Sequence, residues 1–399
     1  MTKILFASWH FYLDQSNGAS ITVRELLRAL SRQGDDVSTF CADAMDYNRQ
    51  ASLDAILELH GIHGVERLHA PSSSPDYSIR SFFDGRIKSI VFSPVQSEKI
   101  PNSSIGRAFL EFFDLTLKKT KPEIVLTYGG YWFGAEMIEI AKRHNAKVVI
   151  LLQNFSYQDS TYFQNADLVL VPSHYAAGYY RGTLGIEALV APPVIDWRKI
   201  VSPEAVMERR YVLFVNPELR KGALFFSRLV ERISELRNDV PFLVIEASAT
   251  GHDLSRFDRK LLANPTVFKA RNTPLPRDFY SLAKITLVPS LFLESFGRVG
   301  AESMIAGVPV VASTRGALPE VLGDAASLLD IPKEYAPETA IMPPTRAGVD
   351  AWVKEIIRLW DDDAYYAKKR KEALTRAQAW TPQKTLEAYQ RAFNRLLDR

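Results

Sequence analysis

Two glutamates in the segment LESFGRVGAESMIAGVPVV, residues 293–311, are spaced so that both could bind one polar ligand. Glu294 comes directly before Ser295-Phe296-Gly297, and Glu302 lies within the helix expected after Gly297. A carboxylate accepts hydrogen bonds from hydroxyl groups, and its two oxygens can hold a vicinal diol. The amides and the dipole of a helix N-terminus attract phosphate. The alternative is that Glu294 only complements the helix dipole and that Glu302 is a solvated helix residue.

The residues before this segment predict a strand that positions it. Thr286-Leu287-Val288 favours a strand, and Pro289-Ser290 follows it. Ligands of doubly wound sheets bind at the carboxyl ends of the strands, next to helix N-termini. The free amides of residues 296–299 would then meet a diphosphate, Glu302 a ribose diol and Glu294 the hydroxyls of a sugar. A nucleotide-diphospho-sugar carries these three groups in that order.

Strands and helices alternate along most of the chain, which predicts an α/β fold with parallel sheets. The first forty residues indicate a strand, a helix over 21–30 and a second strand, and a new series of strands starts at Tyr211. We therefore expect two doubly wound domains, residues 1–200 and 201–379, and an amphipathic helix in 380–399 that packs back on the first domain. The expected strands are 3–7, 37–40, 123–127, 147–152, 167–171, 211–215, 241–246, 265–269, 285–288, 308–312 and 326–329.

Residues 55–106 interrupt this alternation. They contain the run Pro71-Ser72-Ser73-Ser74-Pro75 together with Pro94 and Pro101, and they predict few regular elements. Long irregular segments in compact domains are usually either functional or mobile. A substrate-facing segment and a surface excursion are both open interpretations.

The block ESFGRVGAESMIAGVPVVASTRGALPEVL, which begins at Glu294, resembles the donor-site signature of family-4 retaining glycosyltransferases of the GT-B fold. Gly297, Gly316 and Pro319-Glu320-Val321 are among the matching positions. The resemblance is clear over about residues 211–330 and is mostly architectural elsewhere. It implies two Rossmann-like domains facing a cleft, with the donor held by the C-terminal domain and the acceptor by the N-terminal domain. It also implies that the first acid lies beside the donor sugar and that the second binds the nucleotide ribose.

The turn Asn216-Pro217-Glu218-Leu219-Arg220-Lys221-Gly222 matches the diphosphate clamp of that family with one departure. Lys221 fits the clamping lysine, whereas Asn216 stands where the family has an arginine. Arg220 is a candidate substitute for that arginine. A basic pair at a loop tip is the alternative for both cations.

Three further positions carry weaker signals. Gly18 fits a turn that approaches the diphosphate, although Asn17 replaces a second glycine and a simple helix start is nearly as good an explanation. Arg271 and Asn272 end a strand where the family reads the nucleobase, and a solvated loop cation is the alternative for Arg271. Gln153 replaces a histidine that many relatives carry near the donor sugar, so a histidine base is not expected there.

The composition fits a globular protein, and the basic C-terminal half fits an anionic ligand there, although solvated helix faces alone could give the same charge difference. Hydrophobic residues make up 47% and charged residues 24%, which is ordinary, and bases outnumber acids after Asp196 without forming the dense stripe of a nucleic-acid binder. Cys41 is the only cysteine, which rules out an intrachain disulfide, and zinc-ligand spacings are absent. Asp361-Asp362-Asp363 predicts a turn or a helix cap rather than a metal site. We expect no metal and no cofactor, with the nucleotide-diphospho-sugar as co-substrate.

The chain shows no signal-peptide pattern and no uninterrupted apolar run near the ~18 residues of a spanning helix. A cytoplasmic protein is therefore expected. Residues 107–121 mix phenylalanines with lysines, which leaves peripheral contact with the inner membrane face open, although a core-facing helix with a basic end is the favoured interpretation.

The sequence thus predicts a metal-independent retaining glycosyltransferase that moves a hexosyl-type sugar to an acceptor hydroxyl of a glycan, glycolipid or small molecule. The alternatives are a sugar-nucleotide epimerase or another GT-B enzyme, and a catalytically silent sugar-nucleotide-binding protein. The predicted catalytic residues are Glu294 and Lys221. The predicted donor-binding residues are Gly18, Asn216, Arg220, Lys221, Arg271, Asn272, Glu294, Ser295, Phe296, Gly297, Arg298, Val299 and Glu302.

Overall fold

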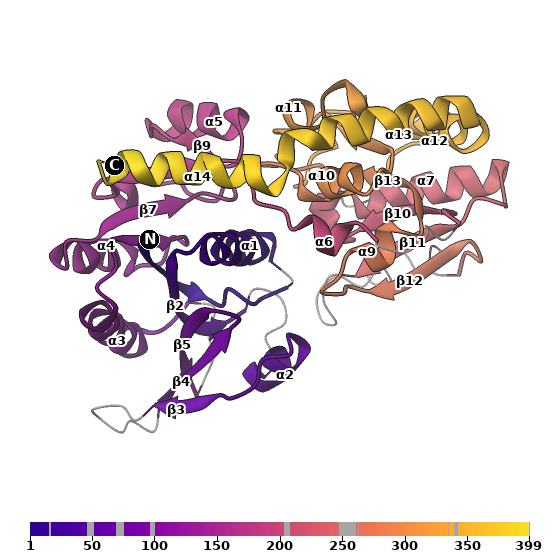
Figure 1. Cartoon of the computed structure of the whole chain (residues 1–399). Coiled ribbons are helices and arrows are strands. Elements are labelled where there is room, and N and C mark those ends of the chain that lie inside the picture. Colours follow the sequence, from indigo (N-terminus) through magenta and orange to yellow (C-terminus); the bar gives the residue numbers. More distant parts are fainter. Residues whose placement is uncertain are drawn as a thin grey trace. The chain divides into compact units, whose positions relative to one another are not determined.

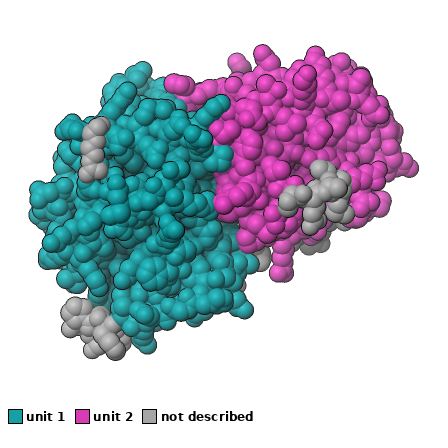
Figure 2. All heavy atoms as spheres, viewed as in Figure 1, with its two compact units in different colours: residues 1–172, 177–194, 382–399 teal, residues 173–176, 195–381 magenta. Residues whose placement is uncertain are grey.

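The chain divides into two compact units, which Figure 2 colours separately. The computed structural model describes residues 1–15, 17–45, 52–68, 76–95, 100–202, 208–246, 261, 263–333, 335–338 and 342–398. Unit 1 comprises Met1–Pro172, Ala177–Val194 and Pro382–Arg399, and unit 2 comprises Ser173–Ala176 and Ile195–Thr381. The chain therefore enters unit 2 after Val194 and leaves it after Thr381, where the sequence placed the boundaries after residues 200 and 379.

Unit 1 contains a nine-stranded sheet within the described residues, in the order β3-β4-β5-β2-β1-β6-β7-β8-β9 (Figure 1). All pairs are parallel except β3–β4 and β4–β5. The order reverses between β1 and β6, which makes that point the topological switch of the sheet. The strands are β1 (Lys3–His10), β2 (Asp36–Ala44), β3 (Glu66–Leu68), β4 (Tyr77–Asp84), β5 (Ile87–Pro94), β6 (Ile124–Thr127), β7 (Lys147–Leu151), β8 (Leu168–Val171) and β9 (Leu189–Val190).

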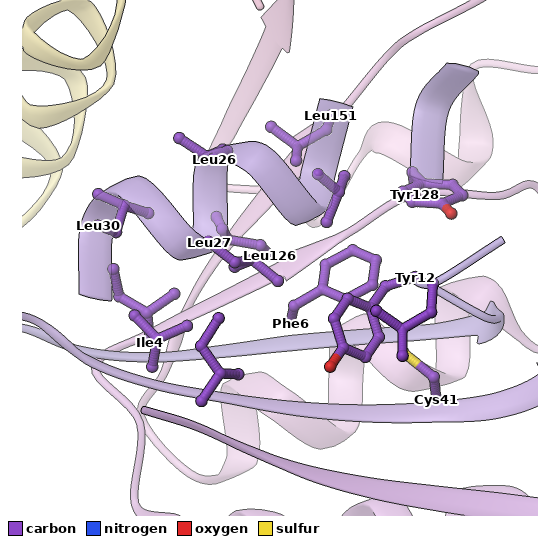
Figure 3. Close-up of a cluster of buried hydrophobic side chains, with 14 of the residues drawn as sticks. Ile4, Phe6, Tyr12, Leu26, Leu27, Leu30, Cys41, Leu126, Tyr128 and Leu151 are labelled. Atoms are coloured by element: carbon purple, nitrogen blue, oxygen red, sulfur yellow. The ribbon is translucent and has the colours of Figure 1, made fainter. Parts of the chain in front are cut away.

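Helices with apolar faces cover this sheet, because strands buried on both sides need a layer on each side. The leucines of α1 at positions 26, 27 and 30 are fully buried and belong to one core cluster with Ile4 and Phe6 of β1, and Figure 3 shows Leu27 on the side of α1 that faces this strand. Cys41 lies in the same core, and burial raises the pKa of its thiol to about 12. The helices are α1 (Gly18–Arg32), α2 (Leu53–Leu59), α3 (Ser103–Thr120), α4 (Gly134–Arg143) and α5 (His174–Leu184), of which α5 begins in unit 2, with a short 3₁₀ turn, η1 (Thr161–Phe163).

The prediction of few regular elements in residues 55–106 was wrong for the part that the structure describes. Strands β4 and β5 form an antiparallel hairpin whose register pairs Asp84 with Ile87. The hairpin joins the main sheet because β5 pairs in parallel with β2. The Pro71–Pro75 run lies outside the described residues.

Unit 2 contains a six-stranded, all-parallel sheet in the order β12-β11-β10-β13-β14-β15, counted over the described residues. Its switch point lies between β10 and β13, because the chain builds outward from β10 on one side and from β13 on the other. The strands expected from the sequence in this half are all present, with ends that differ by one or two residues. They are β10 (Tyr211–Val215), β11 (Phe242–Glu246), β12 (Val267–Arg271), β13 (Ala283–Val288), β14 (Val310–Ser313) and β15 (Ser327–Leu329).

Apolar clusters lie on both faces of this sheet and are closed by helices and short 3₁₀ turns. Asp362 caps α13 by accepting a hydrogen bond from the Tyr365 amide at 2.9 Å, which confirms the expected cap in the triple-aspartate run. The helices are α6 (Trp197–Ile200), α7 (Ala223–Leu236), α9 (Arg277–Tyr280), α10 (Arg298–Ile305), α11 (Leu318–Leu322), α12 (Asp350–Asp361) and α13 (Asp363–Ala377). The turns are η2 (Leu219–Lys221), η4 (Gly323–Ala325), η5 (Ala347–Val349) and η6 (Gln378–Trp380).

The last helix, α14 (Pro382–Leu396), belongs to unit 1 although it follows unit 2 in the chain. Its apolar face, which includes Leu386, Tyr389 and Phe393, joins the unit 1 core beside α1. The Tyr389 hydroxyl donates a hydrogen bond to the Ala191 carbonyl at 3.1 Å. Among the described residues, no helix has the length and hydropathy needed to cross a membrane.

Candidate functional site

The turn after β10 begins at the switch point of unit 2. Asn216 has a φ of 61°, a left-handed conformation that asparagine tolerates better than most residues. Its amide donates to the Ile245 carbonyl at 3.0 Å, and its carbonyl accepts from the Glu218 amide at 2.8 Å. This backbone conformation gives a physical reason for asparagine at the position where the resembled family has an arginine.

Gly222 brings this turn against the end of β13. Its φ is 89°, and a Cβ atom at this position would lie 2.1 Å from the Pro289 carbonyl oxygen, so no other residue fits without a backbone shift. The Leu291 amide also donates to the Arg220 carbonyl at 2.9 Å. The loops after β10 and β13 are therefore fixed to each other.

This contact places Lys221 beside Glu294. The Lys221 Nζ lies 2.9 Å from the Glu294 Oε1, and the Ser290 hydroxyl donates to the same oxygen at 2.6 Å. The Lys221 ammonium also lies 4.4 Å from the centre of the Phe292 ring. Glu294 is only 7% exposed, and both of these donors contact the same carboxylate oxygen.

Gly316 packs directly against the backbone of Glu294. Its φ is 64°, and a Cβ atom there would lie 2.4 Å from both the nitrogen and the oxygen of Glu294. The neighbouring Ala317 amide donates to the Glu294 carbonyl at 2.7 Å. Glycine is therefore needed at position 316, because a side chain there would collide with the Glu294 backbone.

Helix α10 starts at the same edge of the sheet. Gly297 is its N-cap residue, with a φ of 87°, and the amides of the first turn have no acceptor within the helix. The first turn of α10 therefore offers donors to an anion. The side chain of Phe296 is buried, and the centre of its ring lies 6.0 Å from the centre of the Trp380 ring. Only the backbone of Phe296 is therefore available to a ligand.

Glu302, one turn into α10, is 8% exposed and has a donor on each carboxylate oxygen. Arg298 places its Nη2 2.8 Å and its Nε 3.0 Å from Oε1. The Tyr280 hydroxyl donates to Oε2 at 3.1 Å. The alternative of a solvated helix residue is wrong for Glu302. The sequence did not single out Tyr280, because nothing in the spacing of residues 280 and 302 indicates a contact.

Arg220 lies in the same turn as Lys221 but points elsewhere. Its Nε donates to the Glu218 Oε2 at 2.6 Å, and its guanidinium lies 5.5 Å from the centre of the Phe292 ring. The Arg220 side chain is half exposed, whereas Glu218 is buried. The substitution of Arg220 for the missing arginine stays a prediction.

The remaining predicted residues of unit 2 lie at the end of β12 and on either side of Gly297. Arg271 ends the edge strand β12 and is exposed, and the Asn272 amide donates to the Glu246 carbonyl at 2.9 Å. The Ser295 carbonyl accepts from the Ser173 hydroxyl at 2.7 Å, and the Val299 carbonyl accepts from the hydroxyls of Ser303 and Tyr280.

Gly18 is the first residue of α1 in unit 1, capped by the Asn17 side chain, which accepts from the Ala19 amide at 2.8 Å. No atom lies within 4 Å of a Cβ placed on Gly18. Its predicted role at the diphosphate stays a prediction.

The cations of this site are matched with acids in the unliganded chain. Lys221 pairs with Glu294, Arg298 with Glu302, and Arg220 with Glu218. Within the described residues, no three His, Cys, Asp or Glu side chains gather as a metal ion would require, and metal independence stays a prediction.

Solved structures with the same architecture define the fold as GT-B: two Rossmann-like domains, each with a parallel sheet. Sucrose-phosphate synthase from Thermosynechococcus elongatus matches with a TM-score of 0.70 at 17% identity, covering 99% of this chain and 100% of that one. The catalytic domain of starch synthase IV from Arabidopsis thaliana, bound to ADP and acarbose, gives 0.70 at 13% identity, covering 100% of both chains. Anabaena HepE, in complex with UDP and glucose, gives 0.67 at 15% identity, covering 99% of this chain and 100% of that one.

At the level of sequence, residues 196–380 match the family model described as glycosyl transferases group 1. That range contains unit 2 almost entirely and includes both glutamates and Lys221. Among curated proteins, no sequence matches the chain.

Proposed function

We propose that this chain is a retaining glycosyltransferase that transfers a hexosyl-type sugar from a nucleotide-diphospho-sugar to an acceptor hydroxyl without a metal ion. The observation that carries the proposal is the ion pair of Lys221 and Glu294, 2.9 Å long, at the switch point and beside the N-terminus of α10. The family match of residues 196–380 supports the transferase class. Two of the similar structures are complexes with UDP and glucose and with ADP and acarbose, which supports a nucleoside diphosphate donor.

In this proposal, unit 2 binds the donor. The amides of residues 296–299 receive the diphosphate, and Glu302 accepts hydrogen bonds from the ribose diol. Lys221 turns from Glu294 to the phosphate, because a diphosphate carries more negative charge than one carboxylate. That exchange frees the Glu294 Oε1 to accept a hydroxyl of the donor sugar.

The reaction breaks the bond between the sugar anomeric carbon and the diphosphate oxygen and forms a bond from that carbon to the acceptor oxygen. The leaving diphosphate gains negative charge, which Lys221 and the helix amides stabilise in a site that was arranged beforehand. The acceptor proton passes to the departing phosphate oxygen, on the face that retention of configuration requires. Glu294 orients the sugar during this step.

Unit 1 is proposed to bind the acceptor, which is a glycan, a glycolipid or a small molecule with a free hydroxyl. A cytoplasmic location with access to the inner membrane face is part of the same proposal.

The test is a donor panel with Glu294→Ala and Glu302→Ala, assayed for product and for free nucleotide, with Glu372→Ala on the surface helix α13 as the matched control. We expect both site variants to lose turnover and the control to retain it. Parent-like binding and turnover in both variants would contradict the site assignment.

Two product patterns would replace the proposal with an alternative. Altered nucleotide-sugar or free nucleotide released without an acceptor would identify an epimerase or another GT-B enzyme. Donor binding without any glycosyl product would identify a silent homologue, which Asn216 and Gln153 would then explain.

A further inference from the structure

We propose that the exposed ring of Trp132 is a stacking platform for a neutral sugar ring, and that the acceptor of this protein is therefore a saccharide. The proposal rests on the proposed function, because it assumes that unit 1 holds the acceptor. Trp132 follows β6 in the segment Tyr128–Phe133, which the sequence analysis did not single out.

Trp132 lies in the loop between β6 and α4, at the carboxyl edge of the unit 1 sheet. Strand β6 pairs with β1 at the point where the strand order reverses. Ligands of doubly wound sheets bind outside the carboxyl ends of the strands at such a switch point. The loop after β6 therefore lies at the edge of unit 1 where a ligand is expected.

The Trp132 ring is exposed to solvent and yet fixed in position. The residue is 49% exposed, and its indole N–H donates to the Pro101 carbonyl at 3.0 Å. The ring packs against Gly106 of α3, where a Cβ atom would lie 2.4 Å from the Trp132 Cζ2. Phe133 lies edge-on to the same ring, with the ring centres 5.2 Å apart. A ring that is ordered before binding loses little conformational freedom when a ligand stacks on it.

The rest of this loop is also ordered by an aromatic ring packed on a glycine. Gly129 has a φ of 102°, and a Cβ atom there would lie 2.4 Å from the Tyr131 Cε2. The Gly129 amide donates to the Tyr157 hydroxyl at 2.7 Å, and the Tyr131 ring stacks on Phe133 with the ring centres 5.4 Å apart. These contacts give the loop a defined conformation, so Trp132 is presented from a rigid support.

The two segments that hold the ring carry no charge. Residues 100–106 and 128–134 contain no Lys, Arg, His, Asp or Glu. Asn102, Ser103 and Ser104 are exposed at the start of α3 and supply neutral amide and hydroxyl groups. A sugar ring has an apolar face of C–H groups and a rim of hydroxyls, which an aromatic ring with neutral polar neighbours matches. A phosphorylated acceptor or an anionic lipid would call for cations, which these two segments lack.

Removal of the ring should weaken acceptor binding selectively. Tryptophan is prominent among the residues whose truncation costs the most binding energy, so Trp132→Ala should raise the KM for the acceptor about tenfold or more. The proposed donor residues Lys221, Glu294 and Glu302 lie in unit 2, so the affinity for a nucleoside diphosphate should stay at the parent value. A general loss of stability would lower both.

The experiment screens the parent protein with UDP-, ADP- and GDP-hexoses against neutral mono- and oligosaccharides, sugar phosphates and diacylglycerol in mixed micelles, with products identified by mass spectrometry. We expect transfer to a neutral saccharide. Steady-state kinetics with that saccharide then compare Trp132→Ala with Trp132→Phe, which keeps an aromatic face and should raise KM less. Phe83→Ala is the matched control, because Phe83 is another aromatic residue of unit 1, 59% exposed, in the hairpin of β4 and β5. Calorimetric titration with UDP, ADP and GDP and the melting temperatures of all variants identify any general destabilisation.

Transfer only to the sugar phosphates or to diacylglycerol would overturn the saccharide assignment and leave the proposed function intact. A parent-like KM in Trp132→Ala, or equal increases in Trp132→Ala and Trp132→Phe, would overturn the stacking role. A parent protein that transfers sugar to no acceptor would overturn the proposed function itself. The parent protein alone distinguishes this last failure from the others.

Discussion

Buried charges gather in two regions of this molecule, and the two regions differ in what the charges face. In unit 1, Asp84 accepts from both Arg24 and Arg28, with its side chain 1% exposed. In unit 2, Glu294 and Glu302 have one cation each and lie at the carboxyl edge of the sheet, next to a helix N-terminus. The first arrangement pairs the acid with two arginines of α1, whereas the second lies at the sheet edge where ligands of doubly wound sheets bind.

The pKa values of unit 1 agree with a structural role. Burial raises the pKa of Asp84, but hydrogen bonds from Arg28 and the charge of Arg24 outweigh this and hold it below its ordinary value. Burial and the charge of Arg24 lower the pKa of His60, which contacts Arg24 at 2.7 Å, to about 3. His60 is therefore neutral at physiological pH and acts as a hydrogen-bonding partner. The same chemistry stabilises unit 1 and, in the proposed function, would serve donor binding in unit 2.

The largest effect that separates the two regions should come from Asp84→Asn. The change leaves two arginines without their acid, of which Arg24 is nearly buried, and it should lower the free energy of unfolding by about 3–5 kcal/mol. Urea unfolding measures this change. Asp54→Asn is the control, because Asp54 pairs with Arg80 at the surface and its loss should cost about 0–1 kcal/mol. Equal costs for the two variants would remove the distinction between the regions.

Lys221→Ala should impair catalysis. The loss of a preorganised charge at the leaving group should lower kcat roughly a hundred- to a thousand-fold. Steady-state kinetics with the best donor measure it. A variant with the parent kcat would place the leaving-group charge elsewhere.

Acid should weaken unit 1 through Asp84. Because the folded pKa lies below the unfolded value of about 3.9, the stabilisation is present above pH ~4 and is lost as the pH falls through the folded pKa. Urea unfolding of the parent and of Asp84→Asn between pH 3 and pH 7 should show a difference that shrinks at the acid end. A constant difference over this range would contradict the ionic explanation.

Arg220→Ala should have the smallest effect. The guanidinium is half exposed and already held by Glu218, so the affinity for a nucleoside diphosphate should fall by less than about threefold. Calorimetric titration with UDP, ADP or GDP, whichever binds the parent protein most tightly, measures this affinity. A loss of tenfold or more would show that Arg220 does replace the arginine absent at position 216.

Most of the fold could be predicted from apolar runs and turn residues in the sequence. The strands β10 and β13 were predictable because each is an apolar run followed by turn residues, and Gly297 marked the start of α10 correctly. The hairpin of β4 and β5 was not predicted, although its two-residue loop, Gly85-Arg86, has glycine in the first position, which is a hairpin signal.

The contacts within the site were predictable only in part. Lys221 and Glu294 were predicted as members of one site, and the structure brings them together. The contact of Tyr280 with Glu302 and the packing of Gly222 against Pro289 depend on where separate elements meet in space. The spacing of residues along the chain does not indicate contacts between separate elements, so these two contacts could not be predicted from the sequence.

Helix α14 has a consequence for how the protein is made. The ribosome releases its residues after all of unit 2, yet Leu386, Tyr389 and Phe393 complete the core of unit 1. Until they emerge, the apolar face of α1 has no cover on that side, so the half that is synthesised first cannot finish folding first. A chain truncated after Thr381 should carry a folded unit 2 and a loosely packed unit 1, open to chaperones and proteases.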